Sequence, residues 1–324
     1  MIKSFISRLK SRPLLDISQQ QTSSIKVRER WIPILWIGLT GIVVAIMAFT
    51  VWQNRDMLLF EFATARYEYI FWTFMAYALS IWVVASGWHL IMSHLHGQDT
   101  FLTNLKIYVY TLAARRIPGT LWYIAGRAIL YERCGVPKRV TSLASGVEVI
   151  LSVVSGLIVG APVLLSSFGT SPITILLFIT IEVIGLSLLY PTTLKWCLAR
   201  LGYQVEQNAI TIPKVLLWLL IYAVMWICGG LMTYTTISIL QPVPLSQIPT
   251  IIALWSLTGA IAFISFFLPH GLGVSEITLS ILLSQIIPLP IAIMTAILIR
   301  LLTTIFDIMW SSLFFLEKNT VLAP

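Results

Sequence analysis

A break in an apolar stretch near the C-terminal end places a carboxylate where a membrane-spanning helix would carry hydrocarbon side chains. Residues 269–276 read Pro-His-Gly-Leu-Gly-Val-Ser-Glu, within an otherwise apolar region from 248 to 315. An unwound backbone and an ionised side chain are tolerated at membrane depth only inside protein or beside a water-filled cavity, because lipid cannot satisfy their hydrogen bonds. The break therefore predicts that the chain handles a polar group within the membrane.

Polar side chains also follow one face of the apolar run 141–165. At about 100° of rotation per residue, Glu148 shares a helical stripe with small polar residues. We expect this carboxylate to face protein rather than lipid. The other members of the stripe are Ser145, Ser152, Ser155 and Gly156.

The last apolar run, 290–316, carries a second polar stripe with Arg300 near its centre. An unpaired arginine at that depth would cost at least ~2.5–3.5 kcal/mol, so a partner or a hydrated cavity is expected. Glu182 is a further mid-membrane carboxylate, in a less polar setting. The stripe contains Ala296, Arg300, Thr303, Thr304, Asp307 and Ser311.

These ionisable residues have two interpretations. They could form buried ion pairs that only fix the register of packed helices, or they could bind a charged ligand. The helix breaks favour the second interpretation, because the N-terminus of a half-helix directs partial positive charge into the protein and suits a phosphate group.

The two breaks have similar surroundings. Arg127 and Glu148 follow Pro118 by 9 and 30 positions, and Glu276 and Arg300 follow the proline of the second break by 7 and 31 positions. This order suggests an internal duplication, as in transporters that hold their substrate where broken helices meet. Four predicted spans lie between the breaks, so either a broken segment crosses the membrane fully or the repeat is parallel.

Composition and run length define the fold class. The 324 residues are 58% hydrophobic and 10% charged, whereas soluble domains are about 25% charged. A helical crossing needs about 20 apolar residues. We predict an all-α, polytopic bundle with about seven full spans and two re-entrant or broken helices, at 101–130 and 270–287. The predicted spans are 31–52, 70–92, 141–165, 171–190, 214–240, 248–268 and 290–316.

Charge placement predicts the domain organisation and the orientation. Residues 1–30 form a basic arm, 31–316 the membrane domain and 317–324 a short tail. Of 21 Lys and Arg residues, 17 lie in 1–30, 93–140 and 191–214, which the predicted spans place on one side. The positive-inside bias makes this side cytoplasmic, together with the N-terminus. The net charge of +8 then suits anionic lipid headgroups rather than nucleic acid.

Both breaks resemble one known family. Residues 116–119 with 126–127, then 135–136 and Glu148, and later 268–276 with 299–301 are similar to the flippase-like membrane domain of bacterial lysylphosphatidylglycerol synthases and its stand-alone relatives. The resemblance covers about residues 30–316. It departs from the family at residues 120–122, where Thr-Leu-Trp replaces a further glycine, and at His270, which also replaces a glycine.

In the full-length synthases the membrane domain is thought to move aminoacylated phospholipid between leaflets, and a separate C-terminal domain makes that lipid. The resemblance therefore implies translocation without lysyl transfer. We predict a non-enzymatic flippase of the cell (inner) membrane with no metal or other cofactor. Its site is predicted to contain Arg116, Gly119, Arg127, Glu148, Gly271, Gly273, Glu276, Arg300 and Asp307.

The predicted substrate is a lipid with an anionic or zwitterionic headgroup. Aminoacyl-phospholipids, glycolipids and polyisoprenyl-phosphate-linked lipids all satisfy this description, and a lipid-modifying synthase or glycosyltransferase is the expected protein partner. No Gly-rich loop precedes a lysine, so direct use of ATP has no support.

Two other functions stay open on the sequence. A membrane-embedded transferase acting on a lipid carrier would need boundary carboxylates, but Asp99, Glu132 and Glu206 form no motif. A non-transporting scaffold for a lipid-modifying synthase is the other alternative. A histidine cluster near the end of the second span fits an interfacial position better than a metal site, and consists of His89, His94 and His96.

Overall fold

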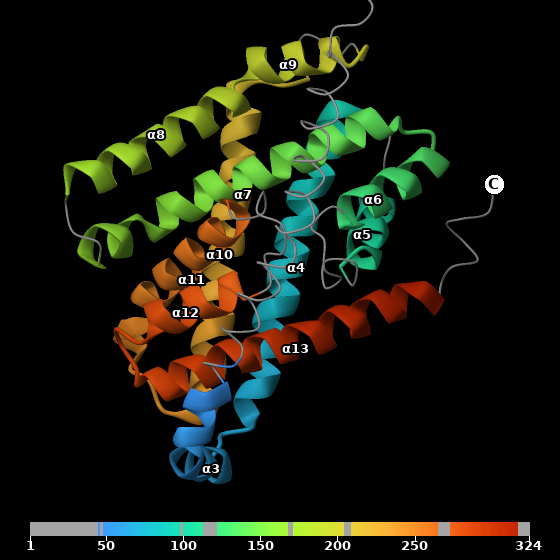
Figure 1. Ribbon diagram of the computed structural model, residues 1–324. Coiled ribbons are helices and arrows are strands. Elements are labelled where there is room, and N and C mark those ends of the chain that lie inside the picture. Colours follow the sequence, from blue (N-terminus) through green and yellow to red (C-terminus); the bar gives the residue numbers. More distant parts are fainter. Residues whose placement is uncertain are drawn as a thin grey trace, which may run out of the picture.

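A computed structural model describes residues 45, 48–97, 100–112, 122–167, 171–203, 209–264 and 273–316. Within these ranges the chain is helical and contains no strand (Figure 1). The helices are α3 (Arg55–Ala63), α4 (Glu68–Leu95), α5 (Phe101–Tyr110), α6 (Trp122–Arg133), α7 (Lys138–Ser167), α8 (Pro172–Leu189), α9 (Pro191–Arg200), α10 (Ile212–Leu240), the 3₁₀ turn η2 (Leu245–Gln247), α11 (Ile248–Ile264), α12 (Val274–Leu283) and α13 (Leu289–Leu316).

The chain is a multi-pass helical membrane protein. Six segments of its described part are long and apolar enough to cross a membrane: α4, α7, α8, α10, η2 with α11, and α13. They correspond to six of the seven predicted spans. The remaining span, 31–52, lies largely outside the described residues, as do the basic arm 1–30 and the tail 317–324.

In the described parts of the two segments predicted to be broken, the helices are short. α5, α6 and α12 have 10, 12 and 10 residues. At 1.5 Å per residue they are about 15–18 Å long, whereas the hydrocarbon core is about 30 Å thick, so none of them spans it alone. α5 starts at Thr100, whose Oγ1 accepts a hydrogen bond from the backbone N–H of Thr103. α12 starts after Gly273, whose φ of 92° is readily adopted only by glycine.

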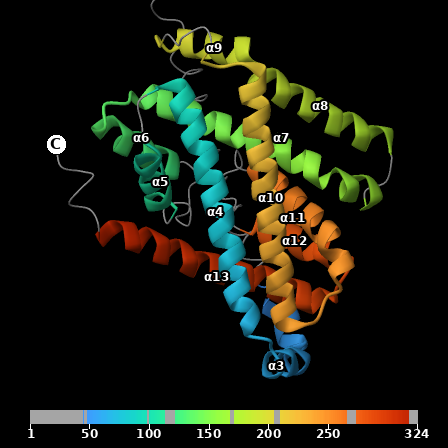
Figure 2. The same ribbon diagram turned by 180° about the vertical axis from the view of Figure 1, so that it is seen from behind.

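The long helices form a crossed bundle rather than a set of parallel rods. α4 and α10 pack side by side, and α10 also contacts α7 and α11 (Figures 1 and 2). α13 crosses the lower part of α4 and α10 in these views and contacts α5, α10 and α12. α8 is peripheral, packs mainly against α7, and leaves most of its apolar surface for lipid.

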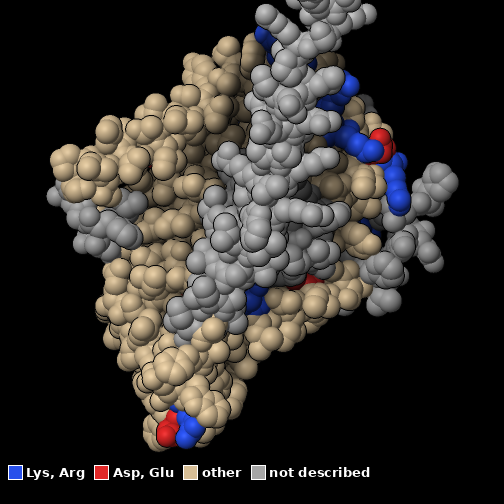
Figure 3. All heavy atoms as spheres, viewed as in Figure 1, with Lys and Arg blue, Asp and Glu red and all other residues tan. Residues whose placement is uncertain are grey.

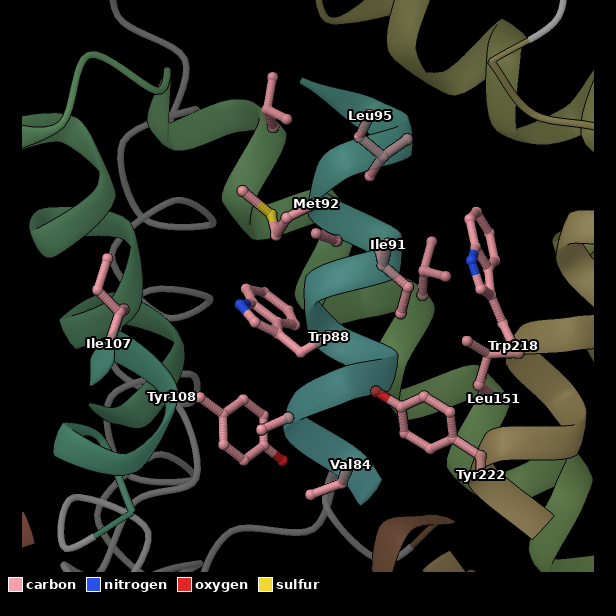
Figure 4. Packing of buried hydrophobic residues seen from close by; sticks show 14 of the residues in the cluster. Val84, Trp88, Ile91, Met92, Leu95, Ile107, Tyr108, Leu151, Trp218 and Tyr222 are labelled. Carbon is pink, nitrogen blue, oxygen red and sulfur yellow. The ribbon is translucent and has the colours of Figure 1, made fainter. Parts of the chain in front are cut away.

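A layer of large aromatic and aliphatic side chains joins α4 to its neighbours. Trp88 of α4 is fully buried between α5 and α6, and Trp218 and Tyr222 of α10 pack near the opposite side of α4 (Figure 4). This packing fixes α5 and α6 against the long helices, although neither crosses the membrane alone.

Charged side chains are few on the part of the surface that Figure 3 draws in tan, blue and red. Figure 3 shows Lys and Arg along the edge where α6 and α9 lie in Figure 1, and a smaller mixed group at the tip formed by α3. At the basic edge, Nη1 of Arg139 donates to the carbonyl oxygen of Leu201 at 3.1 Å. The start of α7 and the residue that follows α9 therefore meet at one end of the bundle.

α10 and α11 pack closely through two tryptophans, each of which covers a glycine of the other helix. A Cβ atom at Gly259 of α11 would lie 2.1 Å from Cη2 of Trp226, and one at Gly229 of α10 would lie 2.1 Å from Nε1 of Trp255. Small residues at helix crossings allow such close approach in membranes. The two indole rings therefore have a fixed place in the centre of the bundle.

We predict that Gly259→Ala destabilises the protein by about 1–3 kcal/mol, the usual cost of overpacking a core. The indole cannot swing away freely, because Nε1 of Trp226 donates to the carbonyl oxygen of Ser152 and to Oγ of Ser155, both at 3.1 Å. Thermal unfolding in detergent measures the effect. Gly146→Ala is the matched control, because a Cβ there meets nothing within 4 Å, and it should leave stability unchanged or slightly raised. Equal changes in stability for the two variants would contradict the close packing of Trp226 on Gly259.

Candidate functional site

A cavity of about 400 Å³ lies at the centre of the bundle, with its wall formed by α4, α7, α10, α11, α12 and α13 and by single side chains of α5 and α6. Four ionisable side chains of the predicted site reach this wall: Glu148, Glu276, Arg300 and Asp307. Aromatic rings supply much of the remainder, from Tyr77, Tyr108, Tyr123, Trp226, Trp255 and Phe263. The cavity is therefore apolar over most of its area and charged at a few points, as small-molecule sites usually are.

Arg300 and Glu276 form an open ion pair on the cavity wall. Nη1 of Arg300 lies 3.4 Å from Oε1 of Glu276, and the two side chains are 39% and 17% exposed. Oγ of Ser275 donates to the other carboxylate oxygen at 2.9 Å. Glu276 lies in the first turn of α12, where the helix dipole is positive and stabilises the carboxylate. The pair is long and partly exposed, so neither partner is enclosed by the other or by protein.

Arg127 and Glu148 form a closed pair. The Arg127 side chain is fully buried, and its Nη1 donates to Oε2 of Glu148, whose side chain is 5% exposed. Nε of Arg127 donates to Oγ1 of Thr111 at 3.1 Å. The hydroxyl of Tyr108 donates to the other oxygen of Glu148 at 2.9 Å. Both carboxylate oxygens therefore have a donor from the protein.

Three aromatic rings enclose the Arg127 guanidinium. Its Cζ atom lies 4.1 Å from the ring centroid of Tyr108, 4.4 Å from that of Trp88 and 5.2 Å from that of Tyr123. Cation–π contacts of this kind are worth about 2 kcal/mol or more when they are desolvated. From the sequence, Arg127 is predicted to bind the lipid headgroup. In the structure its side chain is fully buried and lies behind the cavity wall rather than on it.

A hydrogen-bonded chain continues outward from this enclosure. Nε1 of Trp88 donates to the hydroxyl of Tyr131 at 2.8 Å, and that hydroxyl donates to Oδ1 of Asn104. The amide nitrogen of Asn104 lies 2.7 Å from Nδ1 of His89. Because the amide oxygen already accepts from Tyr131, the amide N–H groups face the imidazole and make Nδ1 the acceptor. The chain orients the ring that covers Arg127.

The three clustered histidines do not share a site. His89 contacts Asn104, Nδ1 of His94 accepts from Nε1 of Trp218 at 3.3 Å, and His96 stacks on Tyr203. Within the described ranges, no group of three or more His, Cys, Asp and Glu side chains is placed to hold a metal ion.

The polar stripe of the last span faces protein, as predicted. Ala296, Arg300, Thr303 and Asp307 all line the cavity, and Oγ of Ser311 donates to the Val109 carbonyl of α5 at 3.0 Å. The prediction for Glu148 also holds, because it lines the cavity among serines that are themselves buried. A further hydrogen bond, from the hydroxyl of Tyr77 to Oδ1, ties Asp307 to α4.

Three predicted site residues, Arg116, Gly119 and Gly271, lie outside the described residues. Gly273 is described and forms the start of α12 beside the open pair. The aromatic wall was not predicted from the sequence. Its members come from five helices, α4, α5, α6, α10 and α11, and nothing in the sequence pattern sets them apart from ordinary core residues.

Comparison with known proteins adds no family assignment. No family model matches the sequence, and no curated protein matches it significantly. The class of the protein therefore follows from its architecture, a multi-pass membrane bundle with a partly charged internal cavity.

We predict that Glu148→Gln destabilises the protein by about 3–5 kcal/mol, because it leaves the Arg127 cation buried without a counter-charge. Glu132→Gln is the matched control, since Glu132 pairs with Lys138 at 2.9 Å but both side chains are more than half exposed. An exposed pair of this kind contributes only about 0–1 kcal/mol. Thermal unfolding of both variants in the same detergent measures the difference. A tolerated Glu148→Gln would show that the buried pair does not hold the bundle together.

Proposed function

We propose that this protein is a lipid transporter of the flippase type, which moves a lipid with a charged headgroup between the two leaflets. The observation that carries the proposal is the open Arg300–Glu276 pair on the wall of the central cavity. A pair that only fixed helix register would be closed and dry, as Arg127–Glu148 is. The proposal agrees with the resemblance of both breaks to the flippase-like domain of lysylphosphatidylglycerol synthases.

The size of the cavity suits a headgroup rather than a whole lipid. Its volume of about 400 Å³ is near the lower end of small-molecule sites, which are roughly 300–1,000 Å³. The acyl chains would stay in the bilayer beside the apolar outer surfaces of the helices. Only the polar part of the lipid then needs a path through protein, and this is the part whose passage through hydrocarbon is costly.

The geometry of the open pair favours a zwitterionic headgroup. Its two charges are 3.4 Å apart, so a phosphate could replace Glu276 on Arg300 while an amine replaces Arg300 on Glu276. Both protein ions then keep a counter-charge, and no unpaired charge is created at depth. A purely anionic headgroup would leave the Glu276 carboxylate beside a second anion. The backbone N–H groups at the start of α12 would add donors to the phosphate.

The closed pair supports this exchange without taking part in it. Glu148 reaches the cavity wall, but both of its oxygens accept hydrogen bonds from protein, and Arg127 lies behind the wall. The pair holds α6 and α7 together on one side of the cavity while α12 and α13 carry the exchanging charges on the other.

We also propose the cell (inner) membrane as the location, with the basic end of the bundle in the cytoplasm. At this end Arg139, from segment 93–140, contacts Leu201, from segment 191–214. Excess Lys and Arg on the cytoplasmic side is the usual pattern in multi-pass proteins, and the arm 1–30 would lie on the same side.

The test is transport of acyl-labelled fluorescent lipids in vesicles, with phosphatidylethanolamine as the zwitterionic and phosphatidylglycerol as the anionic substrate. Arg300→Gln should slow both lipids about tenfold or more, because a charge-assisted contact is worth roughly 1.5–3 kcal/mol. Glu276→Gln should slow the zwitterionic lipid by a similar factor and spare the anionic one, since only the amine needs the carboxylate.

The exposed Glu132→Gln variant is the control for protein amount and insertion, and should transport at the wild-type rate. Normal transport of both lipids by an Arg300→Ala, Glu276→Ala double variant would refute the assigned site. Equal slowing of both lipids by Glu276→Gln would refute the preference for a zwitterionic headgroup but not the assignment of the site.

A further inference from the structure

α8 carries a buried carboxylate that the cavity does not use. Glu182 lies near the middle of this 18-residue helix and is 8% exposed. Neither of its carboxylate oxygens has a hydrogen-bond partner within the described part of the chain. The cavity carboxylates differ in this respect, because Glu148, Glu276 and Asp307 each accept a hydrogen bond from a neighbouring side chain.

The surroundings of Glu182 are apolar and tightly packed. One turn further along α8, a Cβ atom at Gly185 would lie 2.3 Å from Cγ2 of Val154, so α7 and α8 approach closely at this seam. Ile179, one turn before Glu182, and Val183, next to it, are half exposed on the outer surface of α8. Glu182 is thus covered on one side by α7 and lies one helix away from lipid on the other.

Among the described residues, no charge on α7 or α9, the helices packed against α8, offsets the carboxylate. Glu182 is the one ionisable residue of α8. In α7, Lys138 and Arg139 lie in the first turn at the opposite end of the helix from the turn into α8, and Glu148 is directed to the cavity. In α9, Lys195 and Arg200 follow Pro191, beyond the end of the spanning segment. An ionised Glu182 would therefore be an isolated charge at membrane depth, which is strongly unfavourable.

We propose that Glu182 is a proton-binding site within the membrane, occupied as a neutral carboxylic acid and separate from the headgroup cavity. A bound proton removes the charge without requiring a partner, and it gives the side chain an O–H group at a seam where no basic residue lies. Polar residues at this depth usually have a function. This proposal does not depend on the transport proposal, because it concerns a different seam and a different ligand.

The neutral acid has a characteristic reaction with dicyclohexylcarbodiimide, which partitions into hydrocarbon. The acid proton moves to one carbodiimide nitrogen while the carboxyl oxygen bonds to the central carbon, forming an O-acylisourea. Migration of the acyl group to nitrogen then gives a stable N-acylurea. No atom leaves, so the product has the summed mass of the two reactants. A carboxylate held by arginine has no proton to supply and reacts slowly.

The experiment treats the full-length protein in phosphatidylcholine vesicles with dicyclohexylcarbodiimide and maps the adduct by peptide mass spectrometry. Labelling of Glu182 should exceed labelling of Glu148 or Glu276 by about tenfold or more, and it should be lost in Glu182→Gln. A membrane-impermeant, water-soluble carbodiimide should label the exposed Glu132 instead. Unlabelled Glu182, or faster labelling of the paired carboxylates, would overturn the proposal.

Infrared spectroscopy provides a second readout that needs no reagent. The difference between wild type and Glu182→Gln should contain the carbonyl stretch of a protonated carboxylic acid, and the difference for Glu132→Gln should contain only carboxylate bands. A carboxylate signal at Glu182 would contradict the proposal. If the Gln variant did not fold, labelling of the wild-type protein alone would still decide the question.

Discussion

The ion pair between Arg127 and Glu148 is the contact on which the arrangement of this bundle depends. It joins α6 to α7, and the rings that enclose it come from α4, α5 and α6. A guanidinium at this depth is costly unless its charge and its N–H groups are satisfied by protein. Because the satisfying groups lie on four helices between residues 88 and 148, these helices must stay together for any one of them to remain stable. The cavity wall formed by Glu148, Tyr108 and Tyr123 is a direct result.

The two charge pairs show how similar sequence patterns can have different chemistry. Both halves of the chain place an arginine and a glutamate at comparable distances from a proline break, and in both halves these two residues pair with each other. The difference lies in what covers them. Aromatic rings close over the first pair, whereas the second lies at the start of a short helix that opens on the cavity. Burial strengthens the first pair, whereas the second is longer and partly exposed, and it is the pair that we propose to exchange with a headgroup.

Helical periodicity was enough to predict which faces are buried, but not what they contact. Serines on the Glu148 stripe and threonines on the Arg300 stripe correctly indicated faces turned toward protein, and run length predicted six of the spans that the structure describes. The periodicity of polar residues along one helix does not reveal which other helix packs against that face. The enclosure of Arg127 requires rings from three separate segments, and the Trp226–Gly259 contact requires a tryptophan and a glycine more than thirty positions apart. These contacts exist only after the bundle has formed.

α7 contributes to both the wall of the central cavity and the seam that contains Glu182. Its serines donate to carbonyl oxygens of their own helix, as Ser152 does to Glu148 at 2.8 Å, so one face can be polar without further partners. The same helix presents Glu148 to the cavity, Gly156 to the Trp226 ring and Val154 to the seam that contains Glu182. Packed interiors transmit displacement rather than absorb it. A displacement of α7 would therefore affect both the cavity wall at Glu148 and the packing beside Glu182.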